Sequence, residues 1–159
     1  MNTRKWLTIG VVVGLLAGSP FAVMSHGKAK GIVLERHNVM SDIGKAMKRV
    51  GAMVKGKRPL DRADVAKQAD IISDRAAQIE ALFPDTKQSR QGAGSTATPA
   101  VWSEKERFNA ISFDLVEAAK SLSKISGEAT ESEIKQQFRQ LGATCKSCHK
   151  DYRKKKKQH

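Results

Sequence analysis

Aromatic residues are scarce in this chain. They make up 5% of its 159 residues and include a single Tyr. One compact domain is the default for a chain of this length, and such a domain needs a sizeable hydrophobic core. Because so few aromatic side chains are present to fill that core, we expect something other than the polypeptide to occupy part of it.

Patterns that would indicate an enzyme or a nucleic-acid-binding protein are also missing. The chain has no nucleophile beside a base, no carboxylate pair and no glycine-rich phosphate loop. Its formal net charge is +13, but Arg and aromatic residues are not interleaved as they are where bases stack. We therefore predict that the protein is not an enzyme and has no nucleic-acid partner.

Long apolar runs are absent except at the N-terminus. Arg4 and Lys5 precede "WLTIGVVVGLLAGSPFAVM", and small residues follow at plausible cleavage points, as in a secretory signal peptide. An uncleaved membrane anchor is the alternative, because the run approaches the length that spans a bilayer. We predict a signal peptide over residues 1–25 and an exported domain over residues 26–159. Loss of Arg4 and Lys5 lowers the formal charge by two, from +13 to +11.

No stretch of the chain alternates apolar and polar residues, so we predict no sheet. Apolar residues instead recur at steps of three and four. This spacing predicts four helices, over residues 30–55, 61–84, 103–127 and 130–152. Asp61 and the pairs Ser103/Glu106 and Thr130/Glu133 are the expected N-terminal caps. Residues 84–101, rich in Gly, Ser, Thr and Pro, are expected to form a long connection. The fold class that follows is an all-α, antiparallel four-helix bundle.

The only two cysteines lie together near the C-terminus, in "CKSCH". Cys145 and Cys148 continue the apolar stripe of the fourth helix, so both sulfurs are expected to point into the bundle, with His149 beside the same face. Cys-x-x-Cys-His is the attachment signature of c-type haem. Each thiol bonds one vinyl group of the porphyrin, and the imidazole becomes an axial ligand of the iron. We predict one covalently attached haem c, held by the two cysteines, with His149 as the proximal ligand.

Three other uses of this motif are less well supported. A zinc site needs four ligands, and only His26, His37 and His159 remain as further histidines. A redox Cys-x-x-Cys belongs in a thioredoxin-like strand and helix, which the sequence lacks. A plain disulfide is compatible with export but explains neither the adjacent histidine nor the expected gap in the core.

A haem motif on the last helix of a four-helix bundle resembles the class II cytochromes c, the cytochrome c′ family. The resemblance covers roughly residues 30–155 and rests on three segments: "RHNVMSDIGKAMKRVGAMVKG", "PAVWSEKERFNA" and "CKSCHKDYRKK". It implies that Arg36 pairs with a haem propionate and that Met40 faces the distal side of the haem. In the low-spin, six-coordinate branch of the family, a Met at this place is an iron ligand. In the five-coordinate branch the place holds an apolar residue, so Met40 either ligates the iron or packs on the haem face.

Two further residues lie near these positions. The resemblance implies that Arg153 lies close to the proximal imidazole. Alternatively, Arg153 is only a C-terminal charge that favours the helix dipole. His37 lies off the apolar stripe and is expected at the surface.

The favoured function is a periplasmic monohaem cytochrome of the low-spin branch that transfers electrons to and from redox partner proteins. Its rival is a five-coordinate member of the family that binds nitric oxide or carbon monoxide, and a third reading is an exported interaction protein without haem. The basic tail over residues 150–159 is expected to steer an acidic partner or to touch anionic lipid. Membrane contact is otherwise limited to the signal segment. Members of the family are often dimers through their first two helices, so the resemblance allows a homodimer.

Overall fold

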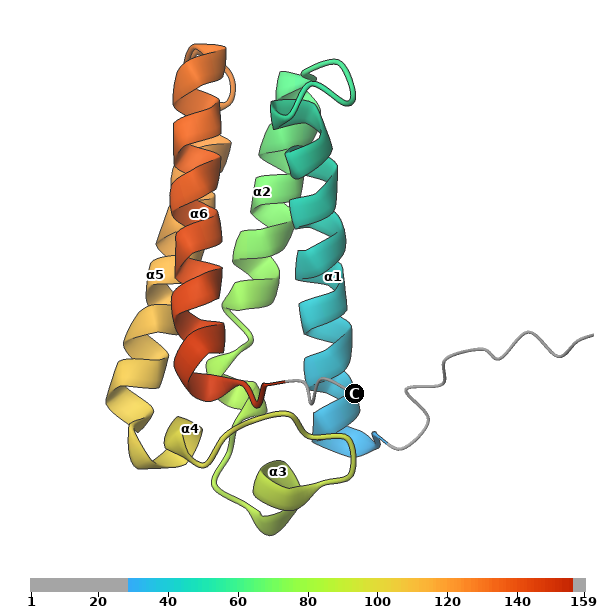
Figure 1. The fold of residues 1–159 in the computed structure, drawn as a ribbon, viewed down its shortest axis with the longest axis vertical. Helices are drawn as coiled ribbons and strands as arrows, with labels where there is room; N and C mark the ends of the chain where they lie inside the picture. The colour runs from blue at the N-terminus through green and yellow to red at the C-terminus, as the bar shows by residue number, and fades with distance from the viewer. Residues whose placement is uncertain (1–28, 156–159) are drawn as a thin grey trace, which may run out of the picture.

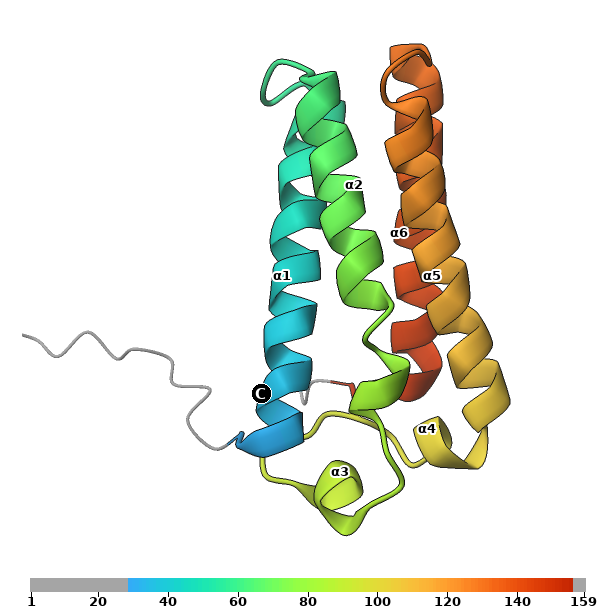
Figure 2. The same cartoon turned by 180° about the vertical axis from the view of Figure 1, so that it is seen from behind.

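The computed structural model describes residues 29–155. Its four long helices, α1 (Gly31–Val54), α2 (Arg62–Ala76), α5 (Lys105–Ile125) and α6 (Glu131–Tyr152), form an antiparallel bundle (Figure 1). Three short helices, η1 (Glu80–Leu82), α3 (Lys87–Gln91) and α4 (Ala100–Ser103), lie in the connection between α2 and α5 at one end of the bundle (Figure 2). Among the described residues the only β-type pairing is an isolated bridge between Ala97 and Arg153. The predicted all-α four-helix bundle is confirmed.

Polar side chains begin two of the long helices where the sequence predicts them. At the start of α2, Asp61 accepts a hydrogen bond from the backbone N–H of Asp64 at 3.0 Å. At the start of α6, Thr130 and Glu133 form a complete capping box. Each cap satisfies backbone N–H groups that the first turn of a helix leaves without an intrahelical partner. These two predicted caps are confirmed.

Two predicted helix boundaries are wrong. Ser103 does not cap a helix with Glu106, because α4 ends at Ser103 and the backbone breaks at Glu104, which has φ −123° and ψ 45° and makes no side-chain cap. The short α4 turn exists because it buries Val101 completely. α2 ends at Ala76 rather than near residue 84, and the chain continues in tighter turns that keep the side chain of the following Ile79 buried.

The interior of the bundle is aliphatic. The largest completely buried side chains are Ile72, Leu122, Ile134, Leu141, Val33, Val50, Val65 and Val101. Burying each such side chain stabilises the fold by about 1.5–3 kcal/mol relative to exposure. Most of the aromatic side chains within residues 29–155 gather at one end instead, where Phe83, Trp102, Phe108 and Tyr152 contact one another in sequence with ring centroids 5.0–6.2 Å apart. That end also holds the connection between α2 and α5.

The long helices do not contact one another equally. α1 packs along α2, α2 along α5 and α5 along α6, whereas α1 and α6 share only a few close approaches. Glycines lie at two of them. A β-carbon on Gly51 would lie 3.4 Å from Cζ of Phe138, and one on Gly142 would lie 3.9 Å from Cε of Met47. Earlier residues of α1 therefore lie opposite later residues of α6.

Within residues 29–155, no helix combines the length and the apolar character needed to cross a bilayer. The long helices carry regularly spaced charged residues, which a membrane span excludes. The predicted signal peptide over residues 1–25 and the last residues of the basic tail lie outside the described part of the chain.

Candidate haem-binding site

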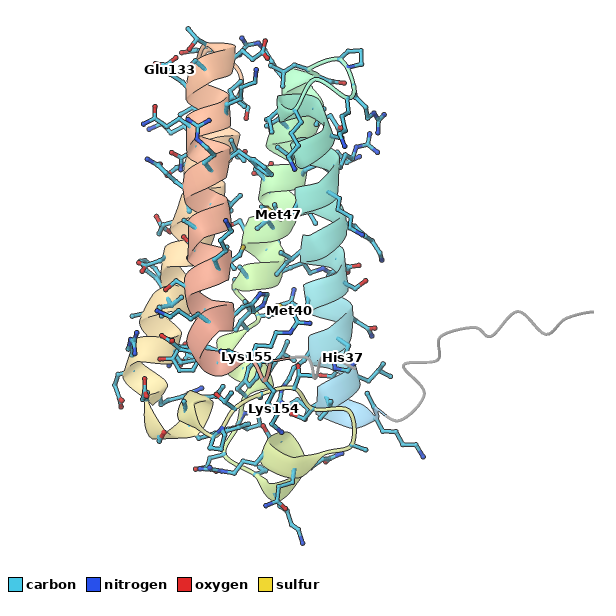
Figure 3. All side chains as sticks on the ribbon, viewed as in Figure 1. His37, Met40, Met47, Glu133, Lys154 and Lys155 are labelled. Atoms are coloured by element: carbon cyan, nitrogen blue, oxygen red, sulfur yellow. The ribbon has the colours of Figure 1, made fainter. Side chains whose placement is uncertain are left out.

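The register of α1 against α6 brings Met40 to the level of the Cys-x-x-Cys-His motif. Met47 faces Gly142 across the two helices. Met40 lies seven residues before Met47, and His149 lies seven residues after Gly142. Seven residues are about two helical turns, so in this antiparallel pair Met40 and His149 reach the same level. Met40 is half-buried against the core, in the half of α1 that lies toward Lys154 and Lys155 (Figure 3).

The two cysteines lie on the side of α6 that faces the core. Both are half-buried against it, and they are not joined in a disulfide. Burial raises the pKa of the Cys145 thiol. Burial, and after it the electrostatic influence of the neighbouring Cys145 and Asp151, raises the pKa of the Cys148 thiol to about 11. A redox-active Cys-x-x-Cys lowers a thiol pKa instead, so these groups are neutral thiols rather than poised nucleophiles.

His149 follows directly and is exposed. Partial loss of hydration against neighbouring protein atoms, followed by the positive charge of Arg153, lowers the pKa of its imidazole. A neutral imidazole keeps the lone pair that a metal ligand needs. The charge of Arg153 therefore acts on the imidazole, while the backbone of Arg153 pairs with Ala97.

Arg36 is a buried cation with no carboxylate partner among residues 29–155. It is 5% exposed, and its side chain enters the connection between α2 and α5. There Nε donates to the carbonyl oxygen of Leu82 at 2.6 Å, Nη1 donates to the carbonyl oxygen of Ser89 at 2.9 Å, and Nη2 donates to the Ser89 hydroxyl. Its guanidinium carbon lies 4.0 Å from the centroid of the Phe83 ring. Burial lowers the pKa of Arg36, because it disfavours the charged form.

These contacts leave two of the five guanidinium N–H groups of Arg36 for an acidic group. A buried charge is costly unless it is paired as well as hydrogen-bonded. The implied pairing with a haem propionate is therefore compatible with the structure, and it stays a prediction.

A structural zinc site does not fit the motif within the described part of the chain. No three His, Cys, Asp or Glu side chains are grouped there closely enough to hold a metal ion. Of the histidines that such a site would have to recruit, His26 and His159 lie outside that part. His37, which the sequence places at the surface, is half-buried on α1 (Figure 3).

The residues present do fit a covalently attached haem. Two neutral thiols point from α6 toward the core, and a thioether and an imidazole reach the same level on α1 and α6. The buried guanidinium of Arg36, one helical turn before Met40 on α1, has two N–H donors left for a carboxylate. The two helices that carry these groups make little direct contact with each other. Together these features are the donor set and the incomplete helix packing that a haem requires.

Comparison with known proteins agrees with this fit. Residues 31–153 match the family model described as Cytochrome C′. The chain is also 33% identical over 152 residues to a cytochrome c′ of Rhodopseudomonas palustris, with 94% of this chain and 98% of the relative covered. The chain belongs to the cytochrome c′ family. Proteins of this family carry one covalently attached haem c per chain, and the predicted cofactor is confirmed.

Other members of the cytochrome c′ family support the same assignment. A cytochrome c-556 of Agrobacterium fabrum is 31% identical over 154 residues, with 96% of this chain and 97% of the relative covered. The solved structure of R. palustris cytochrome c′ superposes with a TM-score of 0.73 at 31% identity, over 80% of this chain and 98% of that one. The relatives carry both names, so the family is shown but the branch within it is not.

The residues that accept hydrogen bonds from Arg36 were not identified from the sequence. Ser89 is completely buried on the short helix α3, in a segment that the sequence predicts only as a connection. A local signal was present, because Thr86 caps this helix by accepting from the N–H of Ser89 at 3.2 Å. A short turn with such a cap is detectable, but its contact with a residue 53 positions earlier is not.

Replacing Arg36 by Lys should lower the free energy of unfolding by about 1–3 kcal/mol, because Lys cannot reproduce the three-way donation and leaves a buried acceptor without a partner. The measurement is urea unfolding of the haem-containing protein. The matched control is Arg75→Lys, because Arg75 is half-exposed and pairs at the surface with Asp42 at 3.3 Å. That change should cost less than about 0.5 kcal/mol. Equal losses in the two variants would contradict a structural role for Arg36.

Proposed function

We propose that the protein is an exported electron carrier whose haem is bonded to Cys145 and Cys148 and ligated by both His149 and Met40. The observation that carries this proposal is the register of α1 and α6, which supports placing Met40 and His149 at one level. The haem supplies an iron that accepts and releases one electron. Met/His ligation favours a raised reduction potential and leaves no open iron position for another ligand.

Several residues of this chain would each hold a different part of the haem. The two thiols tether it to α6, and His149 supplies an imidazole from the same helix turn. Met40 supplies a thioether from α1, and Arg36 supplies charge and hydrogen bonds for an acidic edge. Aliphatic side chains from all four long helices exclude water from the interior. Such a site adjusts a redox centre without binding a substrate, which is why we propose a carrier rather than an enzyme.

A five-coordinate site that binds nitric oxide or carbon monoxide is the second candidate. The sparse contact between α1 and α6 favours it, because a loosely packed Met40 side would admit a small gas molecule. A nitric oxide complex of a mutant cytochrome c′ from Alcaligenes xylosoxidans matches this chain with a TM-score of 0.69 at 26% identity, over 79% of this chain and 94% of that one. In this case Met40 would pack near the iron without ligating it.

We also propose a periplasmic location for the domain over residues 26–159. The signal-like segment over residues 1–25 supports it, and so does the cofactor, because haem attachment of this type occurs outside the cytoplasm. No contact in the structure bears on dimerisation, and a homodimer through the first two long helices stays a prediction from the family resemblance.

An acidic protein is the redox partner that the charge distribution favours. From residue 134 to residue 155 the only carboxylate is Asp151, and it pairs with Arg107 on α5 at 2.8 Å. Besides Arg153, whose charge acts on His149, five basic residues in this stretch are exposed and form no ion pair with another described residue: Arg139, Lys146, Lys150, Lys154 and Lys155. We call these five residues the basic face. It runs along α6 to the end that carries the haem motif, so it would orient an acidic partner toward the haem.

Replacing both Cys145 and Cys148 by Ala should abolish covalent haem attachment. In the unmutated mature protein, intact mass should exceed the polypeptide mass by one haem, and the haem should survive acid–acetone extraction. The control is Ser147→Ala, because Ser147 is exposed in the same turn and carries no thiol. An unmutated protein without haem, or a double Ala variant that keeps covalent haem, would refute this attachment.

Replacing Met40 by Ala should convert the iron from low-spin to high-spin and remove the weak near-red band of sulfur–iron ligation in the ferric protein. Carbon monoxide should then bind the ferrous form at least about tenfold faster, because no internal ligand has to leave first. Optical spectra and stopped-flow mixing measure these changes.

The matched control is Met47→Ala, on the same helix but two turns away. Met47 is half-buried, so its loss should cost about 1–2 kcal/mol of stability and leave the iron low-spin. A high-spin unmutated protein would reject the six-coordinate carrier and favour the gas-binding candidate.

Reversing charge on the basic face should slow reduction by an acidic redox protein. For the variant Lys146→Glu/Lys154→Glu we expect a rate lower by about tenfold at low salt, within the range of electrostatic steering. The unmutated rate should also fall as salt rises, because the Debye length is about 8 Å at physiological ionic strength. The control is Lys67→Glu, an exposed position on α2. A rate that responds neither to salt nor to the reversed charges would leave the basic face without a docking role.

A further inference from the structure

The connection between α2 and α5 is hydrogen-bonded to α1, the helix that carries Met40. Residues 84–99 of this connection are here called the bracket. Its Ser89 accepts two hydrogen bonds from Arg36, which lies one helical turn before Met40 on α1. Close packing adds to this attachment, because a β-carbon on Gly92 would lie 2.8 Å from Cγ2 of Val33. The bracket is thus joined to α1 beside the proposed distal ligand.

The same bracket also holds the helix that carries His149. The Thr98 hydroxyl donates to the carbonyl oxygen of Asp151 at 3.0 Å, and the backbone N–H of Thr98 donates to the carbonyl oxygen of Tyr152 at 3.0 Å. The N–H of Lys154 donates to the carbonyl oxygen of Thr96 at 2.8 Å. The two bonds from Thr98 satisfy carbonyl groups that the last turn of α6 leaves open. They lie within one and a half turns of His149.

α1 and α6 have little other means of fixing their separation at this end. Their own contacts are few, and two of them are the approaches at Gly51 and Gly142 in the other half of the bundle. We infer that the bracket is a positioning device that sets the spacing of α1 and α6, and so decides whether Met40 reaches the iron. In its effect on iron ligation, this inference rests on the proposed function. The positioning residues are Ser89 on the α1 side and Thr98 on the α6 side.

Two variants, each lacking one hydroxyl group, test the contacts of the bracket with α1 and with α6. Ser89→Ala removes the acceptor of Arg36 Nη2, and Thr98→Val removes the donor to Asp151 while keeping nearly the same shape. The matched control is Ser112→Ala. Ser112 is also buried, and its hydroxyl donates to the carbonyl oxygen of Ala76 at 3.5 Å, so it joins α5 to α2 and not α1 to α6. Each of the three variants loses one hydrogen-bonded hydroxyl, but only two loosen the bracket.

The first measurement is carbon monoxide binding to the ferrous protein. If Met40 must leave the iron first, loosening the bracket should raise the observed rate by up to about tenfold, the ratio that corresponds to the loss of one typical intramolecular hydrogen bond. The fraction of high-spin iron in the ferric spectrum should rise with it. Ser112→Ala should change neither quantity.

The second measurement is the α1–α6 distance itself, which does not depend on Met40 ligation. Spin labels at Glu35→Cys and Lys146→Cys lie on exposed positions of the two helices. Electron–electron double resonance on the reduced, carbon monoxide-bound protein, which is diamagnetic, reports their separation. The distance distribution should broaden and shift to longer values in Ser89→Ala and Thr98→Val, and it should stay unchanged in Ser112→Ala.

The outcomes separate this inference from the proposed function. Unchanged distances in Ser89→Ala and Thr98→Val, or equal changes in Ser112→Ala, would overturn the bracket. A high-spin unmutated protein would overturn the six-coordinate carrier, and the distance measurement would still decide whether the bracket sets the spacing of α1 and α6.

Discussion

The weak direct contact between α1 and α6 is the constraint on which the haem site depends. Three of the four neighbouring helix pairs bury continuous aliphatic faces, but this pair approaches closely at only a few places, two of them at glycines. Close packing is the normal condition of a protein interior, so a pair that does not close needs either another group between its helices or an outside support. In the proposed site the haem supplies the first, and in the bracket proposal the connection between α2 and α5 supplies the second.

Arg36 is the residue that contacts the connection and is also placed to bind the haem. Its burial shows that its hydrogen bonds and ring contact offset much of the cost of removing its charge from water. Removing a guanidinium from water is unfavourable, and no carboxylate within residues 29–155 offsets that cost. Three hydrogen bonds and the face of Phe83 reduce it. The two remaining N–H groups of Arg36 are suited to an acidic group, because a buried cation is stabilised most by a hydrogen-bonded anion. One residue can therefore both anchor the connection and bind an acidic edge of the haem.

Paired and unpaired charges lie on different parts of the molecule. Most acidic residues that form ion pairs lie on α1, α2, α5 or the first turn of α6, and their partners are exposed or half-exposed, so these pairs contribute little to stability. The later turns of α6 keep their positive charges uncompensated. Because long-range fields arise from such uncompensated charge, the basic face is suited to guiding a partner rather than to holding the bundle together.

The sequence by itself determined the four amphipathic helices, the caps at Asp61 and Thr130, and the haem motif, because each depends on residues within a few turns of one another. Only the tertiary structure decided which residues lie across from one another. The level shared by Met40 and His149 follows from helix register, and the contact of Arg36 with Ser89 joins residues 53 positions apart. Local spacing carries no information about such contacts, because they arise only when separate helices pack. For the same reason the segment over residues 84–101 reads as a plain connection in the sequence and becomes a structural support in the fold.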